Sequence, residues 1–326
     1  MATDGQYPAL SLVIPFFNEE ASLPLLRDRM LQLQGLPENR EIVFVSDGST
    51  DRSVAIVEEW AAADERVRLL ILTRNFGHQP AICAGLDAAR GDWVAIMDAD
   101  LQDLPEVMLQ MYETAREGGW DIVFNTRVER SGSILKQFAY RMFYKGYSAL
   151  ADSPVDSHSG DFAVLSRRAA DALVALPEKI RFVRGLRAWL GLRSKAFASP
   201  RPMRAAGRPQ YTLPKLVGLA LNGLTSFSIR PLRIATIGGL ILCLLALCLA
   251  LAYIVLLVVY DLHDALPGFT TIVVLILFLS GVQFMLMGLI GEYIGQIFLE
   301  VKRRPTYVID RAVNLPRDRP SPARPV

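Results

Sequence analysis

The sequence has 326 residues, of which 52% are hydrophobic and 21% charged, and its formal net charge is +2. With a mean hydropathy of +0.28, the composition indicates one sizeable soluble domain together with apolar segments that a soluble domain does not need. The three cysteines indicate neither a disulfide framework nor a metal-ligand spacing. We also expect no nucleic-acid partner.

The amino-terminal part of the chain predicts an α/β domain. Its first 30 residues include Asp4, Glu19, Glu20 and Asp28 without an uninterrupted apolar run, so we expect no signal peptide and a cytoplasmic domain. Stretches with helical periodicity separate apolar, β-branched runs at residues 10–15, 41–46, 67–72, 93–98 and 121–126. Strands that alternate with helices in this way predict a mostly parallel sheet with helices on both faces.

Polar clusters follow the first four predicted strands, at the carboxyl ends where such sheets bind ligands. The clusters are Pro15, Asn18 and Glu19; Asp47, Ser49 and Asp51; Arg74, Asn75, Phe76, Gly77 and His78; and Asp98, Asp100 and Gln102. For a single cluster a helix cap is as good an explanation, and Ser49, Thr50 and Asp51 suit one. Four clusters on one rim of one sheet favour a binding site.

The fourth cluster, in the stretch MDADLQDLPE, places Asp98, Asp100 and Asp103 within six residues. Carboxylates this close repel one another unless the loop is solvated or a cation neutralises them. A D-x-D pair at a strand end directs both side chains to the same side of a turn, where they can ligate Mg²⁺ or Mn²⁺ while phosphates complete its shell. An EF-hand is excluded because residues 103 and 109 are Asp and Leu rather than Gly and Glu, and no dinucleotide or P-loop motif occurs.

The middle of the chain leads towards a membrane. We expect a helix at 134–150, a strand from 161, a helix at 167–176, a loop at 199–210 and an interfacial helix at 211–228. Residues 1–178 contain 16 basic and 27 acidic side chains, whereas residues 179–233 contain 12 basic and no acidic ones. A basic segment just before a membrane span favours contact with anionic headgroups over a merely solvated surface.

Two apolar segments, residues 234–260 and 270–291, carry no charged side chain and are each long enough to cross a hydrocarbon core of about 30 Å. The loop between them has Asp261 and Asp264 but no basic residue, whereas Arg230 and Arg233 precede the first segment and Lys302, Arg303 and Arg304 follow the second. The positive-inside rule therefore predicts two membrane spans with both termini in the cytoplasm.

The second span and the tail carry two further signals. Gly291 and Gly295 form a G-x-x-x-G pattern, which favours close helix contact within the hairpin or between protomers, with a lipid-facing glycine as the alternative. From about residue 305 the chain is rich in Pro and Arg, so we expect it to be disordered.

Five ordered motifs, SLVIPFFNEE, VSDGSTD, RNFGHQPAICAGLDAARGD, MDADLQDLPE and GDFAVLSRR, followed by two spans, resemble the polyprenyl-phosphate glycosyltransferases of the inverting family-2 GT-A type. This group includes dolichol-phosphate mannose synthases and bacterial undecaprenyl-phosphate glycosyltransferases. The resemblance implies a Rossmann-like GT-A domain at 1–198, a basic loop and interfacial helix at 199–231, a two-helix membrane hairpin at 232–301 and a cytoplasmic, partly disordered tail at 302–326.

The same resemblance implies transfer of one sugar, with inversion, from a nucleotide diphosphate sugar to undecaprenyl or another polyprenyl phosphate. UDP-glucose is the expected donor; UDP-N-acetylglucosamine, GDP-mannose and a UDP-4-amino-arabinose derivative remain open. Mg²⁺ or Mn²⁺ would be the cofactor, membrane lipids would be further partners, and the enzyme would be a homotetramer in the cell inner membrane, serving cell-envelope glycan modification.

The resemblance also implies roles for individual positions. Pro15, Phe17, Glu19, Asp47 and Asp98 would bind the nucleotide sugar; Asp98, Asp100 and Gln102 the metal; Arg184, Arg208, Tyr211 and Lys215 the lipid phosphate; and Asp100 and Asp161 would be catalytic. Two positions depart from the family pattern. Ser46 replaces a common Asp, and Ala163 replaces a common Arg, whose phosphate contact is then missing or supplied by Arg167 or Arg168.

A lipid phosphate needs no strong general base, because the second pKa of a phosphate monoester is about 6 and the dianion is its own nucleophile. Catalysis should therefore consist of positioning and charge stabilisation. We expect Asp161 to be a metal or orienting ligand first and a base second. His78 and His158 lack a metal-ligand spacing, so loop hydrogen bonds are expected of them.

Two competing functions can be weighed on the sequence. A processive polysaccharide synthase would need a Q-x-x-R-W motif and more spans, whereas here only RAWLG surrounds Trp189. A non-catalytic scaffold or flippase partner with a degenerate domain should have lost some of Asp47, Asp98, Asp100 and Gln102, and all four are present.

Overall fold

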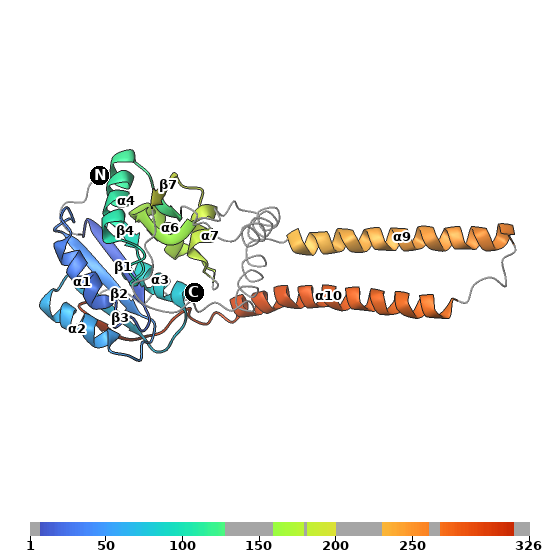
Figure 1. Ribbon diagram of the computed structural model, residues 1–326, viewed down its shortest axis with the longest axis horizontal. Coiled ribbons are helices and arrows are strands. Elements are labelled where there is room, and N and C mark those ends of the chain that lie inside the picture. The colour runs from blue at the N-terminus through green and yellow to red at the C-terminus, as the bar shows by residue number, and fades with distance from the viewer. Residues whose placement is uncertain (1–6, 128–158, 179–180, 200–229, 261–267, 316–326) are drawn as a thin grey trace. The chain divides into compact units, whose positions relative to one another are not determined.

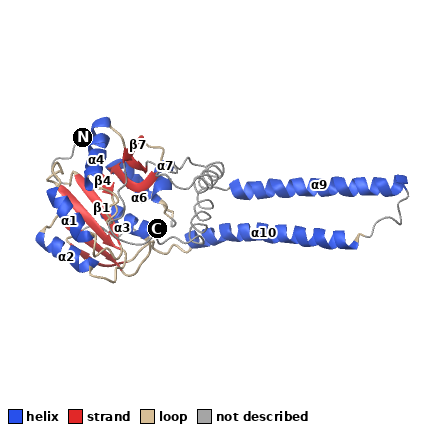
Figure 2. Ribbon diagram, viewed as in Figure 1, coloured by secondary structure: helices blue, strands red, loops and turns tan. Residues whose placement is uncertain are grey.

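The computed structural model describes residues 7–127, 159–178, 181–199, 230–260 and 268–315. These residues form two compact units, which are described separately: an α/β unit that also includes the chain from Arg304 onwards, and a unit of two long helices. Figures 1 and 2 show the elements of both units. The predicted helix at 134–150, the interfacial helix at 211–228 and the residues His158, Arg208, Tyr211 and Lys215 lie outside the described residues.

The α/β unit is built on an eight-stranded sheet of order β7-β5-β6-β4-β1-β2-β3-β8. Its strands are β1 (Leu10–Phe16), β2 (Arg40–Ser46), β3 (Val67–Leu72), β4 (Trp93–Ile96), β5 (Ile122–Arg127), β6 (Ser159–Ser166), β7 (Ser194–Ser199) and β8 (Ile309–Val313). The β1–β4 and β1–β2–β3 pairings are parallel, as predicted, whereas β6 runs antiparallel to both β4 and β5. The sheet is therefore mixed: its central strands are parallel, and a further parallel pair, β5–β7, lies at one edge.

Helices cover both faces of this sheet, as the sequence predicts. They are α1 (Leu23–Gln32), α2 (Ser53–Ala63), α3 (His78–Ala88), α4 (Pro105–Gly118), α6 (Arg167–Ala175) and α7 (Val183–Trp189). Successive residues of β2 point to opposite faces: Phe44 packs in the core with α1, α2 and α4, while Val43 and Val45 pack in the core with α3. Because both faces are buried, the central strands read as continuous apolar runs.

The two edge strands of the sheet were not expected from the sequence. The predicted disorder from about residue 305 is wrong for residues 306–315, because β8 pairs antiparallel with β3. The Asn314 amide donates to the carbonyl oxygens of Ala61 and Val67 at 2.7 and 3.0 Å. Pairing with a distant strand supplies the backbone partners that local composition does not reveal.

The second unit contains α9 (Arg230–Tyr260) and α10 (Phe269–Val301). Within the described residues, one segment, Phe278–Val301, is long and apolar enough to cross a membrane, and Ala235–Ala246 is a shorter apolar segment. With 33 residues, α10 is about 49 Å long and exceeds a hydrocarbon core of about 30 Å. The helix thus continues past the predicted span, through Glu292 and Glu300.

Candidate active site

The polar clusters after β1 and β2 meet at one rim of the sheet, as predicted. Asn18 accepts a hydrogen bond from the backbone N–H of Thr50 at 2.8 Å and donates its own N–H to Ser49 Oγ at 3.1 Å. The N–H of Glu19 donates to Ser53 Oγ at 2.8 Å. These side chains hold the two loops together, so contacts between the loops account for Asn18, Ser49 and Thr50.

Asp47 joins the second cluster to the third. Its buried carboxylate accepts hydrogen bonds from the backbone N–H groups of Phe76 at 2.7 Å and Gly77 at 2.9 Å. Burial raises the pKa of this carboxyl above its ordinary value, although the two N–H groups oppose the shift. Asp47 therefore fixes the loop that leads into α3, and a contact with a nucleobase stays a prediction.

Gly48 allows the same two loops to touch. Its φ is +68°, and a Cβ at this position would lie 2.5 Å from the carbonyl carbon of Arg74. Both the left-handed backbone and the close contact therefore require glycine.

The D-x-D-x-Q loop follows β4 and contains a strained turn. Leu101 has φ of +61°, which is uncommon for a bulky residue and typical of functional sites when it occurs. Asp100 accepts from the backbone N–H of Gln102 at 3.0 Å, and Asp103 accepts from the N–H of Asp98 at 3.4 Å. Asp103 thus contributes to the internal support of the loop.

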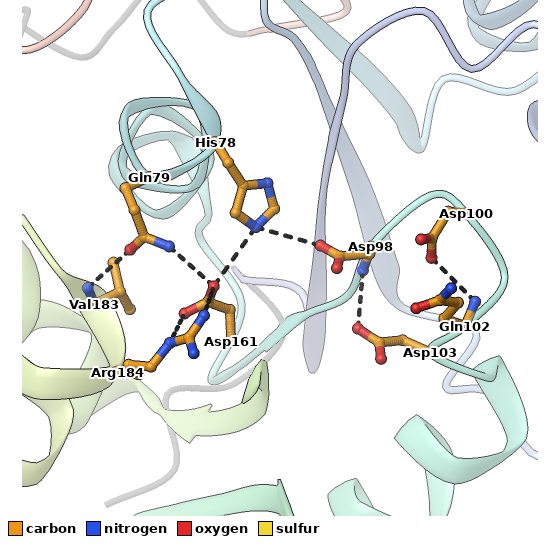
Figure 3. A network of polar contacts seen from close by, with 9 residues as sticks. All are labelled: His78, Gln79, Asp98, Asp100, Gln102, Asp103, Asp161, Val183 and Arg184. Atoms are coloured by element: carbon orange, nitrogen blue, oxygen red, sulfur yellow. Dashed lines mark hydrogen bonds and ion pairs between the residues drawn. The ribbon is translucent and has the colours of Figure 1, made fainter. Parts of the chain in front are cut away.

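The two carboxylates of the D-x-D pair have different partners in this structure, and their joint binding of one cation stays a prediction. In Figure 3 the Asp98 carboxylate points toward His78, whereas the Asp100 carboxylate lies across the loop beside Gln102. Across the described ranges, no three His, Cys, Asp or Glu side chains are grouped to hold a metal. The oxygen ligands still suit a hard cation such as Mg²⁺, which needs only one or two carboxylates when substrate phosphates and waters complete its shell.

Asp161 lies on β6 and is the centre of a second polar network (Figure 3). Arg184 on α7 binds it through Nε at 3.3 Å and Nη2 at 3.0 Å, and Gln79 Nε2 donates to it at 2.9 Å. Burial raises the pKa of the Asp161 carboxyl, but the charge and hydrogen bonds of Arg184, followed by His78 and Arg187, outweigh burial and lower the pKa overall. A carboxylate with a lowered pKa is a weaker base, and the orienting role of Asp161 stays a prediction.

His78 connects the two networks. Its Nε2 lies 3.4 Å from Asp98 Oδ1 and 3.6 Å from Asp161 Oδ2, and its side chain is 44% exposed. The sequence predicts only a loop hydrogen bond for His78, but the structure places it between a proposed metal ligand and the Asp161–Arg184 pair. The signal that could have identified it is its position in the third rim cluster, at the start of the helix that leads from β3 to β4.

The three predicted nucleotide-sugar residues at the end of β1 differ in exposure and in partners. Phe17 is 42% exposed at the rim, whereas Pro15 is buried inside β1 opposite Val45. Glu19 accepts from Ser22 Oγ at 2.7 Å at the start of α1.

The predicted substitute for the missing phosphate contact is not available at Arg167. Its guanidinium donates to the carbonyl oxygens of Gly91 at 3.0 Å and Ala89 at 3.1 Å, away from the rim network. Ala163 itself is fully buried between β4 and β5, where Ile96 and Phe124 are its neighbours across the strands. Arg167 and Ala163 therefore do not supply the missing contact, and the alternative, Arg168, stays a prediction.

Two sequence families match the chain. The family described as Glycosyl transferase family 2 matches residues 11–174, and the one described as GtrB C-terminal hairpin matches residues 230–297. The first covers most of the α/β unit, and the second covers α9 and most of α10.

Several curated proteins resemble nearly the whole chain. An uncharacterized glycosyltransferase of Bacillus subtilis, YkcC, is 36% identical over 95% of both chains, and one of Synechocystis, sll0501, is 39% identical over 92% of this chain and 94% of its own. The SfII prophage-derived bactoprenol glucosyl transferase of Shigella flexneri is 38% identical over 93% of this chain and 98% of its own. The similarity therefore includes both the α/β unit and the helical hairpin.

Proposed function

This chain belongs to glycosyl transferase family 2 and transfers a sugar from a nucleotide sugar to a polyprenyl phosphate, and we propose that the sugar is glucose, donated by UDP-glucose. The acceptor in this proposal is undecaprenyl phosphate at the cytoplasmic face of the inner membrane. The anomeric configuration is inverted, and the product serves cell-envelope glycan modification.

The observation that best supports glucose is the 38% identity, over 93% of this chain, to a protein named as a bactoprenol glucosyl transferase. That similarity covers the donor-side rim, the Asp161 network and the helical hairpin together. UDP-N-acetylglucosamine, GDP-mannose and a UDP-4-amino-arabinose derivative are the competing donors.

The donor half of the proposed site is the rim from Phe17 to the D-x-D-x-Q loop. The half-exposed ring of Phe17 would contact the nucleoside, and Asp47 would keep the loop at Phe76 and Gly77 beside it. Asp98 and Asp100, with Gln102, would hold Mg²⁺ or Mn²⁺. Such an ion would neutralise the charge that develops on the departing nucleoside diphosphate.

The acceptor half of the proposed site is the Asp161 network. A polyprenyl phosphate is largely dianionic at pH 7, so its own oxygen attacks the anomeric carbon and no residue has to remove a proton. Arg184 keeps 30% of its side chain exposed while paired with Asp161, so its guanidinium can hold the incoming phosphate. The departing diphosphate and the incoming lipid phosphate would then lie on opposite sides of His78, which would align them for in-line transfer.

The proposal also includes the membrane topology. Both α9 and α10 would span the bilayer, with the chain termini and the α/β unit in the cytoplasm and Arg208, Tyr211 and Lys215 near the lipid phosphate. The helical continuity of α9 over 31 residues and the hairpin family match support two spans. Assembly as a homotetramer rests on the family resemblance.

The decisive experiment incubates the purified full-length protein in lipid nanodiscs with undecaprenyl phosphate and a panel of labelled sugar nucleotides. We expect label in the lipid fraction from UDP-glucose, and none from the Asp100→Asn variant. Preference for another sugar nucleotide would replace glucose in the proposal. Label in the lipid from Asp100→Asn at the wild-type rate would contradict the metal-assisted mechanism.

A further inference from the structure

Gln79 occupies the first turn of α3 and uses both ends of its side-chain amide. Nε2 donates to Asp161 Oδ2 at 2.9 Å, and Oε1 accepts from the backbone N–H of Val183 at 2.9 Å (Figure 3). One side chain therefore ties together α3, β6 and α7, which are far apart in the sequence.

The bond to Val183 replaces a missing cap. Val183 is the first residue of α7, and the preceding residue, Phe182, makes no side-chain capping bond. The first N–H groups of a helix have no partner within the helix, so the Gln79 oxygen satisfies one of them from another element. Gln79 therefore contributes to the orientation of this short helix.

Arg184 is the next residue along α7, and its guanidinium is held on two sides. Asp161 binds it through two hydrogen bonds, and the ring of Phe182 lies 5.1 Å from its central carbon. Gln79 contacts both supports of Arg184: it binds Asp161 directly and fixes the turn from which Arg184 projects.

We propose that Gln79 is a positioning residue for the acceptor phosphate: its amide locks Asp161 and the first turn of α7 so that Arg184 is presented to the phosphate. This inference rests on the proposed function, in which Arg184 binds the polyprenyl phosphate. Gln79 itself touches neither substrate.

The chemistry requires an amide of this length. A glutamate could still accept from Val183 but would place a second negative charge against Asp161. A methionine fills a similar volume but offers no comparable donor or acceptor. The two substitutions therefore separate the capping bond from the bond to Asp161.

The test compares Gln79→Met, Gln79→Glu, Arg184→Ala and the double variant Gln79→Met/Arg184→Ala in nanodiscs. The KM for undecaprenyl phosphate and the kcat are measured at saturating UDP-glucose, and UDP binding is measured by calorimetry. Gln79→Met loses both hydrogen bonds. We expect it to raise the KM for the acceptor at least about tenfold, since loss of the bond to the charged Asp161 alone accounts for about that factor, while the Kd for UDP stays within about twofold. Gln79→Glu should be at least as impaired, although it keeps the cap.

The double variant distinguishes positioning from direct contact, because residues that act through one another do not add. In the Arg184→Ala background, Gln79→Met should change kcat/KM for the acceptor by less than about twofold. Three results would overturn the inference: additive losses in the double variant, wild-type kinetics in Gln79→Glu, or equal weakening of UDP and acceptor binding in Gln79→Met. A wild-type protein that transfers no sugar would instead overturn the proposed function, and the inference with it.

Discussion

Tyr307, six residues after the end of α10, donates a hydrogen bond from Oη to the Asp87 carboxylate on α3 at 2.6 Å. The two residues are 220 positions apart in the sequence. α3 begins with His78 and Gln79 and carries Asp87 near its other end. The chain that leaves the long helix is thereby fastened to the helix that carries part of the proposed site.

Replacing Tyr307 by Phe should loosen this fastening. The change removes the phenol donor from the partly buried Asp87 carboxylate, and loss of a hydrogen bond to a charged group costs about 1.5–3 kcal/mol. We expect a lower Tm and faster amide hydrogen exchange in β8 and β3. Tyr7→Phe is the matched control because Tyr7 is 48% exposed at the surface. Equal Tm values for the two variants would contradict a stabilising role for the Tyr307–Asp87 bond.

The Tyr307–Asp87 pair should make the free energy of unfolding depend on pH in the alkaline range. Burial, followed by the charge and the hydrogen bond of Asp87, raises the pKa of Tyr307 above the ordinary value of about 10. The folded state therefore holds this proton more tightly than the unfolded state. The resulting stabilisation is complete below about pH 10 and is lost as the pH rises above that value.

Thermal unfolding of wild type and Tyr307→Phe across the alkaline range checks this dependence. Cys83, whose pKa burial raises to about 11, also titrates in the alkaline range, and its charge acts on Tyr307, so the comparison reports on Tyr307 together with Cys83. A stability difference that did not shrink as the pH rose above about 10 would be inconsistent with the raised pKa.

Gly48 should tolerate no side chain, because a Cβ would collide with the loop at Arg74 and Asn75 that Asp47 binds. Gly191→Ala is a close control: its φ of +63° resembles the +68° of Gly48, but no atom lies within 4 Å of its Cβ position. The control should cost about 1–2 kcal/mol for the left-handed backbone alone.

We expect Gly48→Ala to destabilise the protein more than Gly191→Ala and to weaken UDP binding at least about tenfold, since the collision displaces a loop of the donor half. Differential scanning calorimetry and UDP titration measure the two effects. If both variants lost the same stability and kept the same UDP affinity, the contact between the two loops would have no role in donor binding.

Part of the candidate site could be predicted from the sequence, because its residues follow strands whose direction could be predicted. Strands β1 to β6 follow from apolar runs, and the shared rim follows from parallel strands ending together, so Asp47, Asp98 and Asp100 could be placed near one another. Asp161 and Arg184 were predicted separately, and their pairing depends on β6 running antiparallel into the sheet. Nothing local in the sequence indicates that direction.

Gln79 and β8 show a second limit. A glutamine in the first turn of a helix is ordinary, and only the tertiary approach of Val183 and Asp161 gives its amide two partners. Residues 309–313 carry two charges in five positions and gain their strand conformation from pairing with β3. In both cases the determining contact is with residues distant in the sequence.

Removal of divalent cations should abolish sugar transfer. We expect EDTA to lower turnover at least about a hundredfold and either Mn²⁺ or Mg²⁺ to restore it, because several kcal/mol of charge stabilisation at the diphosphate are lost without the ion. Asp100→Asn should remain inactive at added-metal concentrations that restore wild type. Asp171→Asn is the control acid, since its side chain is 63% exposed and pairs with Arg167 outside the site. Full activity in EDTA would exclude the proposed role of Asp98 and Asp100.

Asp161→Asn should impair both stability and acceptor use. The lowered pKa of Asp161 means that its ionised form stabilises the folded state above the ordinary carboxyl pKa of about 3.9, and that this contribution is lost as the pH falls below it. The stability difference between wild type and Asp161→Asn should therefore shrink in acid. At pH 7 the variant should lose at least about tenfold in kcat/KM for undecaprenyl phosphate, because Arg184 loses its charged partner.

The pH–rate profile of the residual activity then separates orientation from base catalysis at Asp161. If the acceptor dianion is its own nucleophile, the acid limb follows the second phosphate pKa of about 6 in both wild type and Asp161→Asn. If Asp161 removed a proton instead, the limb would follow its carboxyl and vanish in the variant. Wild-type turnover in Asp161→Asn would show that Asp161 has no role in the site. It would also contradict the proposal that Asp161 holds Arg184 toward the phosphate.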